Sequence, residues 1–342
     1  MIKDNIYLEY QKMLRRETIN LNLYDNKEDS EAEEISFFLK ELLTELTNIV
    51  ADKKIKFSIF WIDSSDVNAS VVKIKDTYCI GLFRGIITSL KDHIENYYVD
   101  NNKIKGNTLR LTKNLYLNAF DASNENAKLG NYIFTMAFFY IIMHEFGHIL
   151  CGHADKTLDT IIEMNYEQNE KTTGNYNRQA KEYMADFYGI ANSLNMILAS
   201  FHSSMEELID CIGIYSTAIQ SVFWIFNFYS KDFHGQDWGK NTHPHPIVRM
   251  KYCLALVEEE LKHSLNIFHS RKELDFSLNE SNTNRISDLA FALYLNLVSS
   301  SDVLLSWNTM ASNECDNEID KILSAVQGVK EYYRDSALID YI

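Results

Sequence analysis

The residues of this sequence best suited to chemistry are two histidines and a glutamate in the segment HEFGH, residues 144–148. His144 and His148 are four residues apart, so on a helix both imidazoles lie on one face and can bind one metal ion. Glu145 can then orient a water molecule on that metal and accept its proton. Two imidazoles and a carboxylate with one open position favour zinc. A bare HExxH also arises by chance, so this segment alone leaves an ordinary buried helix open.

The third metal ligand separates the classes of zinc site that share HExxH. The metzincin pattern HExxHxxGxxH requires glycine at position 151 and histidine at position 154, but this chain has Cys151 and Ala154 there. The metzincin pattern therefore fails. The other class takes its third ligand, a carboxylate, from a following helix.

The segment EYMAD offers that carboxylate, because Glu182 lies 34 residues after His148. Glu182 and Asp186 are four residues apart and share one helical face. Glu182 can therefore bind the metal, while Asp186 accepts the outer N–H of a ligand histidine, for which we choose His144. Ala185 keeps the crossing of the two helices close. For Glu182 alone an ordinary acidic helix face is the simpler interpretation, and the upstream HExxH is what favours a metal site.

A later segment, THPHPIVRM, adds His243 and Arg249. With it, the sequence resembles the gluzincin zinc metallopeptidases, in particular the HtpX-like and CAAX-prenyl-protease-like peptidases. These carry HExxH, a further histidine nine residues after the first, a Glu-x-x-x-Asp helix and a THP-x4-R element. His153 stands at the place of the further histidine. The EYMAD segment also resembles prophage and antitoxin-regulating metallopeptidases, and the chain resembles, more loosely, the phage-exclusion peptidases of the Lit type.

The resemblance implies roles for the residues of THPHPIVRM. His243 would lie beside the metal-bound water or the oxyanion, where it could donate a hydrogen bond to a tetrahedral intermediate. Arg249 would pair with the carboxylates of the Glu182–Asp186 helix, and a guanidinium forks well onto a carboxylate. The alternative is that His243 and His245 are turn residues before a helix. We interpret His153 as a structural histidine near the free carbonyls at the end of the metal helix.

The hydropathy pattern places these segments on helices that follow a small sheet. We expect strands at 56–62, 68–74 and 77–82 and helices at 31–53, 85–94, 131–151, 176–198, 208–229 and 248–263, with two or three more in 283–342. This order predicts an α+β fold that is predominantly helical. The resemblance, which covers about 55–255, adds a zincin-type metallopeptidase core with a small N-terminal β-sheet. We divide the chain into an N-terminal helical segment (1–54), this core (55–265, with an irregular insertion at 95–128) and a C-terminal helical segment (266–342).

Composition limits the partners. The 342 residues carry a formal net charge of −15, which argues against nucleic acid because phosphate binding depends on Lys and Arg. Five widely spaced cysteines fit reduced thiols and a cytoplasmic location. The apolar stretch 132–143 is short for a membrane span and 208–229 carries polar residues, so we expect buried helices and no membrane partner. The oligomeric state is left open.

We therefore expect a zinc metallopeptidase that hydrolyses protein or peptide substrates, with zinc on His144, His148 and Glu182 and with Glu145 as general base. A peptide could add as an extra strand along the strand pair at 67–82. Two alternatives stay open. One is a defence or regulatory effector with the same chemistry that acts on one folded host protein. The other is a binding protein that keeps a zincin core without turnover, and the retained Glu145 argues against it.

Overall fold

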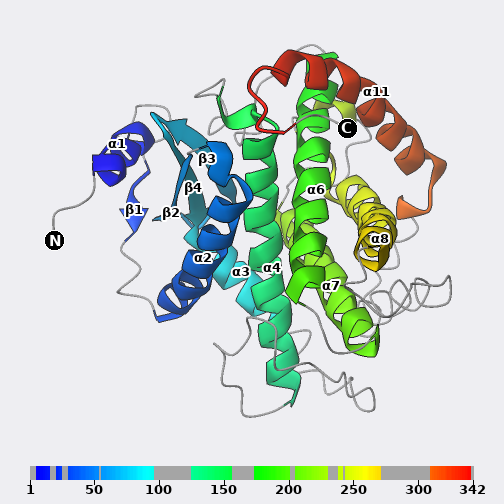
Figure 1. Ribbon diagram of the computed structural model, residues 1–342, viewed down its shortest axis with the longest axis horizontal. Helices are drawn as coiled ribbons and strands as arrows, with labels where there is room; N and C mark the ends of the chain where they lie inside the picture. The colour runs from blue at the N-terminus through cyan, green and yellow to red at the C-terminus, as the bar shows by residue number, and fades with distance from the viewer. Residues whose placement is uncertain are drawn as a thin grey trace.

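The computed structural model describes residues 5–15, 21–24, 30–53, 55–95, 125–155, 173–200, 205–229, 238–241, 243–270 and 309–339. The α-helices are α1 (Asn5–Leu14), α2 (Ser30–Ile49), α3 (Arg84–Ile94), α4 (Glu125–Leu150), α6 (Thr173–Ser200), α7 (Met205–Tyr229), α8 (Pro246–Ser270) and α11 (Asn313–Tyr333). The strands are β1 (Leu23–Tyr24), β2 (Lys56–Ile62), β3 (Ala69–Ile74) and β4 (Thr77–Phe83), and short 3₁₀ helices are η2 (Ala51–Lys53), η5 (His153–Asp155) and η6 (Trp238–Lys240). The predicted α+β fold with a predominance of helix is confirmed (Figure 1).

The four strands form one mixed sheet in the order β1-β2-β4-β3. β2 runs parallel to β4, whereas β3 runs antiparallel to it, with Val71 opposite Ile80. The turn between β3 and β4 falls at the predicted position, and Lys75 adopts a φ of 58° there. Because β4 occupies one edge of β3, the opposite edge of β3 lies at the margin of the sheet.

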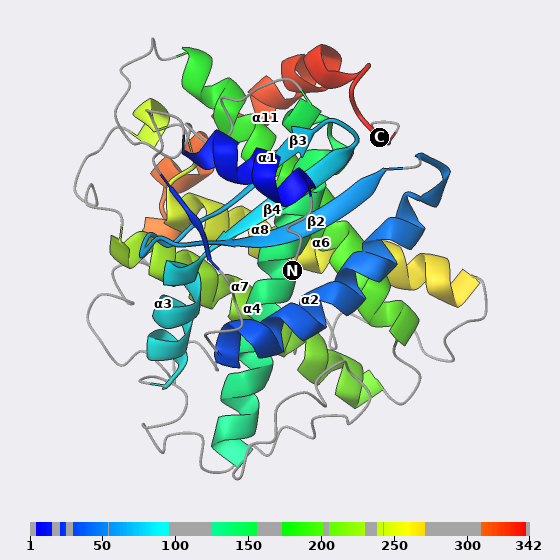
Figure 2. The same cartoon turned by 90° about the vertical axis from the view of Figure 1, so that its left-hand side faces the viewer.

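Successive side chains of a strand point to opposite faces of the sheet, and apolar strand residues lie on both faces. Helices therefore cover both faces. α1 lies across one face (Figure 2), where Tyr10 and Leu14 pack in one cluster with Ile62 and Val72. The other face joins the main core, to which α2, α3 and α4 contribute. The sheet is therefore held between a short N-terminal helix and the helical layer that carries the HEFGH segment.

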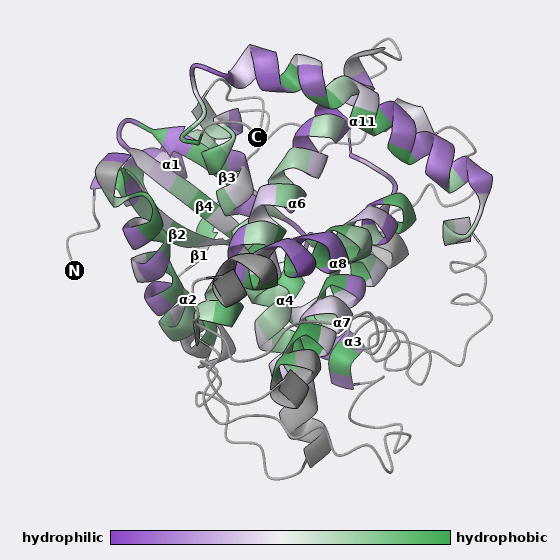
Figure 3. Cartoon of the chain, turned by 45° about the vertical axis from the view of Figure 1, so that its right-hand side comes forward, coloured by the Kyte–Doolittle hydropathy of each residue, from purple (hydrophilic) through white to green (hydrophobic). Residues whose placement is uncertain are grey.

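α4 and α6 lie side by side in the middle of the molecule, with the sheet on one side and α8 on the other (Figure 1). α11 packs against α6 and also contacts α8. Figure 3 shows α4 largely in the colours of apolar residues, whereas α11 carries a hydrophilic stripe. The amphipathic pattern of α11 matches a helix that packs with one face and exposes the other.

The apolar part of α4 is longer than the stretch 132–143 that the sequence analysis considered. Gly130–Leu150 is long and apolar enough to cross a membrane by length and composition, and 94% of its most apolar window is buried inside the structure. A helix that is apolar all round and enclosed by other helices is the pattern of a protein core. The expectation of a buried helix holds here, but the argument from short length was wrong.

Each predicted strand and helix within the described residues has a counterpart, although α4 begins six residues earlier and α8 ends seven residues later than predicted, and α1 and β1 were not predicted as individual elements. Two predicted regions are only partly described. Residues 96–124 of the predicted insertion lie outside the described residues, and its last residues already belong to α4, which begins at Glu125. Of the predicted C-terminal helices, α11 is described and the rest of 283–342 before residue 309 is not. The three-part division of the chain stays a prediction.

Candidate metal centre

Three predicted ligands from two helices meet at one point. His144 and His148 project from α4 with their Nε2 atoms 3.1 Å apart. Glu182 projects from α6, with one carboxylate oxygen 3.4 Å from His144 Nε2 and the other 3.3 Å from His148 Nε2. All three side chains are buried, and within the described residues they form a group that could hold a metal ion.

The dimensions of this triangle fit zinc. Zinc ligands lie about 2.0–2.2 Å from the ion in tetrahedral geometry, so neighbouring ligand atoms are about 3.3–3.6 Å apart. The two imidazole nitrogens are 3.1 Å apart, and each lies 3.3–3.4 Å from a different oxygen of the Glu182 carboxylate, so the contacts between the three side chains are close to that value. The donor set, two imidazoles and one carboxylate, is also a catalytic zinc set with room for a fourth ligand.

The charge of the centre also fits a divalent cation. Glu145, Glu182 and Asp186 are three buried carboxylates, and Arg249 is the one buried cation of fixed charge that contacts them among the described residues. With both histidines neutral the group carries a net charge of −2. Buried charges need compensation. A 2+ ion at the triangle would bring the sum to zero.

Close contact between α4 and α6 depends on two glycines. A Cβ on Gly147 would collide with the backbone carbonyl of Ala185. The two helices therefore cross closely at Ala185, which is the crossing that the sequence analysis expected. A Cβ on Gly189 would lie 2.6 Å from the carbonyl oxygen of Met143. The backbones of α4 and α6 therefore touch on both sides of His144. This close approach lets the side-chain carboxylate of Glu182 reach the two imidazoles.

Asp186 is the most enclosed charged residue of the site and accepts from several donors. His144 Nδ1 lies 2.8 Å from Asp186 Oδ1, as predicted. The hydroxyl groups of Tyr140 and Tyr252 donate to the same carboxylate at 2.7 and 2.9 Å. Burial alone would raise the pKa of Asp186, but Arg249 and His144 outweigh it and hold that pKa well below its ordinary value. The carboxylate therefore stays ionised and fixes the orientation of His144.

Arg249 joins the two carboxylates of α6, as the resemblance implied. Its Nε and Nη2 donate to Asp186 at 2.8 and 3.0 Å, and its Nη1 lies 3.1 Å from Glu182 Oε2. The guanidinium also lies against the imidazole of His144 and over the ring of Phe223, 5.1 Å from its centroid. A buried, bidentate guanidinium in this position organises the carboxylates rather than meeting a ligand from solvent.

Ionisation of the metal-free centre follows from the same contacts. Burial and Arg249 oppose protonation of His144, but Asp186 and Glu182 outweigh them and raise its pKa to about 9. Burial opposes the charged form of Glu182, but His243, His148 and Arg249 together hold its pKa well below the ordinary value. Glu182 is therefore ready to bind a cation, whereas His144 must lose a proton to do so.

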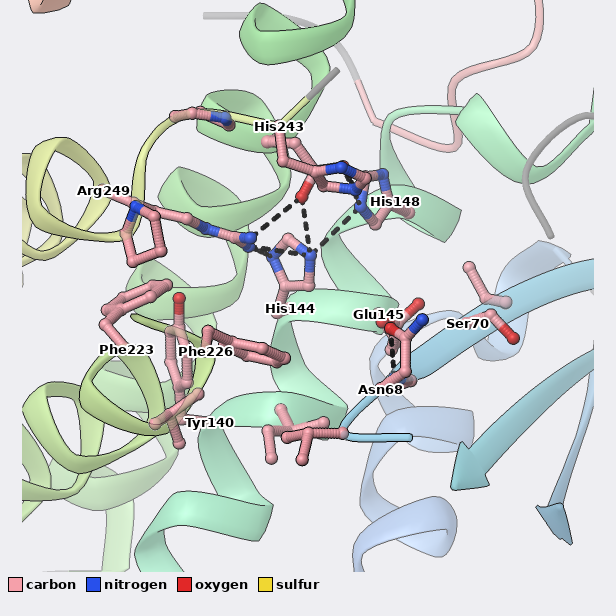
Figure 4. Close-up of a pocket in the computed structure, with 18 of the residues that line it drawn as sticks. Asn68, Ser70, Tyr140, His144, Glu145, His148, Phe223, Phe226, His243 and Arg249 are labelled. Carbon is pink, nitrogen blue, oxygen red and sulfur yellow. Dashed lines mark hydrogen bonds and ion pairs between the residues drawn. The ribbon is translucent and has the colours of Figure 1, made fainter. Parts of the chain in front are cut away.

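Glu145 faces a pocket of about 150 Å³ beside the triangle. In Figure 4 it lies on the side of the site that carries Asn68 and Ser70 of the β3 region, both of which line the same pocket. Burial is the largest influence on Glu145 and raises the pKa of its carboxyl group, although His144 and His148 oppose the shift. A carboxylate with a raised pKa next to a candidate metal is suited to accept and return a proton.

His243 reaches the site from the loop before α8. Its Nε2 lies 3.7 Å from Glu182 Oε1, and its side chain is 30% exposed at the pocket. The loop is held by Gln179, whose amide donates to the backbone carbonyls of Trp238 and Asn241 at 3.0 and 2.8 Å. The prediction that His243 lies near the chemistry is thus consistent with its position, and its role stays a prediction.

His245 has the structural part that the alternative interpretation assigned to it. Its Nδ1 accepts the backbone N–H of Ile247 at 3.2 Å in the first turn of α8, which Pro246 opens. Its ring stacks on Trp238, with centroids 5.1 Å apart, and burial lowers its pKa to about 4. His245 therefore caps a helix as a neutral side chain.

His153 makes a contact that the sequence analysis missed. Its Nδ1 lies 3.0 Å from Nδ1 of the candidate ligand His148, so it does not simply serve the free carbonyls at the end of α4. Sequence reasoning also missed Tyr140 and Tyr252 as partners of Asp186. Tyr140 precedes His144 by four residues and so shares its helical face, a signal that periodicity could have provided.

Comparison with known proteins agrees with this centre. Neither the curated proteins nor the solved structures contain a match. The model of one family, Peptidase U49, matches residues 98–268, which is half of the chain's 342 residues. The matched range contains HEFGH, EYMAD and THPHPIVRM, the three segments that build the centre. The chain therefore belongs to the Peptidase U49 family, the family of the Lit-type peptidases that the sequence resembles.

Proposed function

We propose that this member of a peptidase family is a zinc-dependent endopeptidase in which His144, His148 and Glu182 hold the metal and Glu145 is the general base. The observation that carries the proposal is the group of three buried side chains, His144, His148 and Glu182, whose ligand atoms lie within 4.8 Å of one another beside a pocket that Glu145 lines. Zinc bound there would supply a Lewis acid that polarises a peptide carbonyl and acidifies a water molecule.

Glu145 moves the proton in this scheme. Its carboxylate takes a proton from the water that attacks the peptide carbonyl carbon. The carboxylic acid then delivers that proton to the nitrogen of the leaving amine as the C–N bond breaks. Burial favours the neutral acid, which makes the second step easier, while the neighbouring histidines favour the carboxylate needed for the first.

The margin of β3 is the proposed binding edge for the substrate. Residues 67–71 line the same pocket as His144 and Glu145, so the predicted edge is next to the centre. A peptide that adds to β3 as a further strand would gain main-chain hydrogen bonds without a requirement for particular side chains. Its scissile carbonyl would then face the candidate metal.

His243 and Arg249 support the reaction in different ways. His243 is partly exposed at the pocket, where its N–H can donate to the oxygen of the tetrahedral intermediate. Arg249 is buried and held by Glu182 and Asp186, so it keeps the ligand carboxylate in place. We assign His243 to the oxyanion and Arg249 to positioning.

The experiment combines metal analysis with one substitution. Wild-type protein and Glu145→Gln are purified without chelators, and the zinc in each is measured by mass spectrometry. The proteins are then incubated with a proteome-derived peptide library and, separately, with a native cell lysate, and new peptide termini are identified in both samples. Glu318→Gln is the matched control, because Glu318 is also buried but lies on α11 away from the pocket.

The proposal expects about one zinc per chain in all three proteins and new termini with the wild type and the control only. Loss of cleavage in Glu145→Gln should be at least 100-fold. Wild-type protein without bound metal, or a Glu145→Gln variant that cleaves normally, would contradict it. Cleavage of a folded protein in a lysate without cleavage of library peptides would favour the narrow effector. Bound zinc with no cleavage in either sample would favour the silent binding protein. The cytoplasmic location stays a prediction.

A further inference from the structure

A third histidine lies behind the candidate metal ligand His148. Nδ1 of His153, in η5, is 3.0 Å from Nδ1 of His148. The His153 side chain is 2% exposed, and its Nε2 has no hydrogen-bond partner in the part of the chain that the structure describes. A buried polar atom without a partner costs stability. The presence of a histidine at this position is therefore explained by the contact that its other nitrogen, Nδ1, makes with His148.

The contact between the two rings restricts where their hydrogens lie. Two nitrogens 3.0 Å apart form a hydrogen bond only when one carries the hydrogen and the other a lone pair. His148 directs Nε2 toward His144 and Glu182, so binding a cation there requires the hydrogen of His148 on Nδ1. His153 must then accept at Nδ1 and carry its own hydrogen on Nε2. The pair has one neutral arrangement that leaves His148 Nε2 free for a metal.

The C-terminal segment holds His153 in this position. The ring of Tyr333, at the end of α11, meets the His153 ring at 72° with centroids 4.8 Å apart. The ammonium of Lys181 lies 5.2 Å from the centroid of Tyr333. Tyr333 is therefore packed between α6 and the imidazole and fixes the plane of the latter.

The same segment is fitted closely to the end of α4. The backbone N–H of Leu338 donates to the carbonyl of Leu150, the last residue of α4, at 2.8 Å. Gly152 has a φ of +73°, and a Cβ there would lie 2.5 Å from the carbonyl carbon of Ser336. The turn that carries the chain from α4 to His153 is thus shaped around residues 336–338.

We propose that His153 is a positioning residue that fixes the tautomer and orientation of the metal ligand His148, and that α11 holds His153 in place through Tyr333. The inference rests on the proposed metal centre. It assigns a purpose to a C-terminal segment that lies beyond the residues matched by the family model. It also separates His153 from the ligands themselves, since His153 contacts the outer nitrogen of His148.

The first test is zinc affinity, measured by competition with a chromophoric chelator. His153→Leu removes the acceptor and should weaken binding 10–100-fold, the usual cost of losing the hydrogen-bond partner of a metal ligand. His153→Asn places an amide oxygen near the position of Nδ1 and should restore most of that loss. Tyr333→Leu should weaken binding several-fold, whereas Tyr333→Phe keeps the ring and should match the wild type.

The second test does not need the metal. Long-range proton–nitrogen NMR of ¹⁵N-histidine-labelled, metal-free protein reports which ring nitrogen of His148 carries the hydrogen. The wild type should show the Nδ1–H form, and His153→Leu should show a mixture of both tautomers. A residue with a merely structural role would not change this signal.

The outcomes separate this inference from the proposed function. Wild-type affinity and an unchanged His148 tautomer in His153→Leu would overturn the inference, as would His153→Asn binding no better than His153→Leu. If His153→Leu does not fold, wild-type affinity and tautomer in Tyr333→Leu would overturn it. Zinc affinity that survives Glu182→Gln unchanged would instead contradict the metal centre, and the tautomer of His148 would still test His153.

Discussion

The two histidines of the centre are supported in opposite ways. The outer nitrogen of His144 faces Asp186, an ionised carboxylate that also receives Arg249 and two tyrosine hydroxyls. The outer nitrogen of His148 faces His153, whose other neighbour is the aromatic ring of Tyr333. One side is charged and rich in hydrogen bonds, and the other is neutral and aromatic.

The charge of the centre explains why the two sides differ. With the proposed divalent ion bound, three carboxylates and one guanidinium would sum to zero, so a fourth carboxylate behind His148 would leave a buried negative charge. A neutral imidazole supplies an acceptor without that charge. The comparison also divides the chain, because the charged side comes from α4, α6 and α8, within the matched residues, whereas the neutral side depends on α11.

The largest effect is expected on the charged side, from Asp186→Ala. The substitution leaves Arg249 buried with Glu182 as its remaining carboxylate partner. It also removes the acceptor of the Tyr140 and Tyr252 hydroxyl groups. The metal-free protein should lose about 3–5 kcal/mol in its free energy of unfolding, measured by urea denaturation. Asp316→Ala, which removes an exposed partner of Lys251, should cost at most about 1 kcal/mol. Equal costs for the two variants would break the comparison.

Tyr140→Phe comes next, because it removes a single donor to the Asp186 carboxylate. A hydrogen bond to a charged group contributes about 1.5–3 kcal/mol, so the free energy of unfolding should fall by that amount. Tyr215→Phe is the control, since Tyr215 is equally buried but its hydroxyl does not donate to a carboxylate among the described residues. A destabilisation of Tyr215→Phe as large as that of Tyr140→Phe would contradict the account.

The pH dependence of zinc binding should report on the His144 side. In the metal-free protein, Asp186 and Glu182 outweigh burial and raise the pKa of His144 to about 9. Below that pH zinc must displace a proton, so affinity should rise about tenfold per pH unit between pH 6 and 8. Calorimetry in two buffers of different ionisation enthalpy should show about one proton released at pH 7. Asp186→Asn removes the main source of the raised pKa and should reduce this release, and an unchanged release would contradict the assignment.

The smallest effect is expected in α11. Gly328 lies within this helix, and a Cβ there would have no atom within 4 Å. Gly328→Ala should raise the free energy of unfolding by about 0.5–1 kcal/mol, because alanine favours the helix. Zinc affinity should stay unchanged, since the ring of Tyr333 is not altered. A large change in affinity would mean that the stability of α11, rather than its contact with His153, governs the site.

The histidine and carboxylate pairs of the centre could be predicted from the sequence because their spacings are local, whereas the two tyrosine donors of the charged side were missed. His144 and His148, and likewise Glu182 and Asp186, are separated by one helical turn, and periodicity turns that spacing into a shared face. The β3–β4 hairpin was predictable because two strand-like runs lie on both sides of a short polar turn at Lys75 and Asp76.

The neutral side could not be predicted, because it depends on contacts distant in sequence. His153 reaches His148 only through the turn at Gly152, and Tyr333 lies 180 residues further along the chain. No local pattern indicates that the C-terminal segment packs on the end of α4. The length of the apolar stretch in α4 was underestimated because polar residues at its ends interrupt the run.

The most direct measurement of the central claim is an anomalous difference map from crystals of the zinc-loaded protein, recorded at the zinc absorption edge. The account predicts one strong peak about 2.0–2.2 Å from His144 Nε2, from His148 Nε2 and from a carboxylate oxygen of Glu182. A peak elsewhere in the chain, or a fully loaded crystal in which Glu182 points away from the two imidazoles, would contradict it.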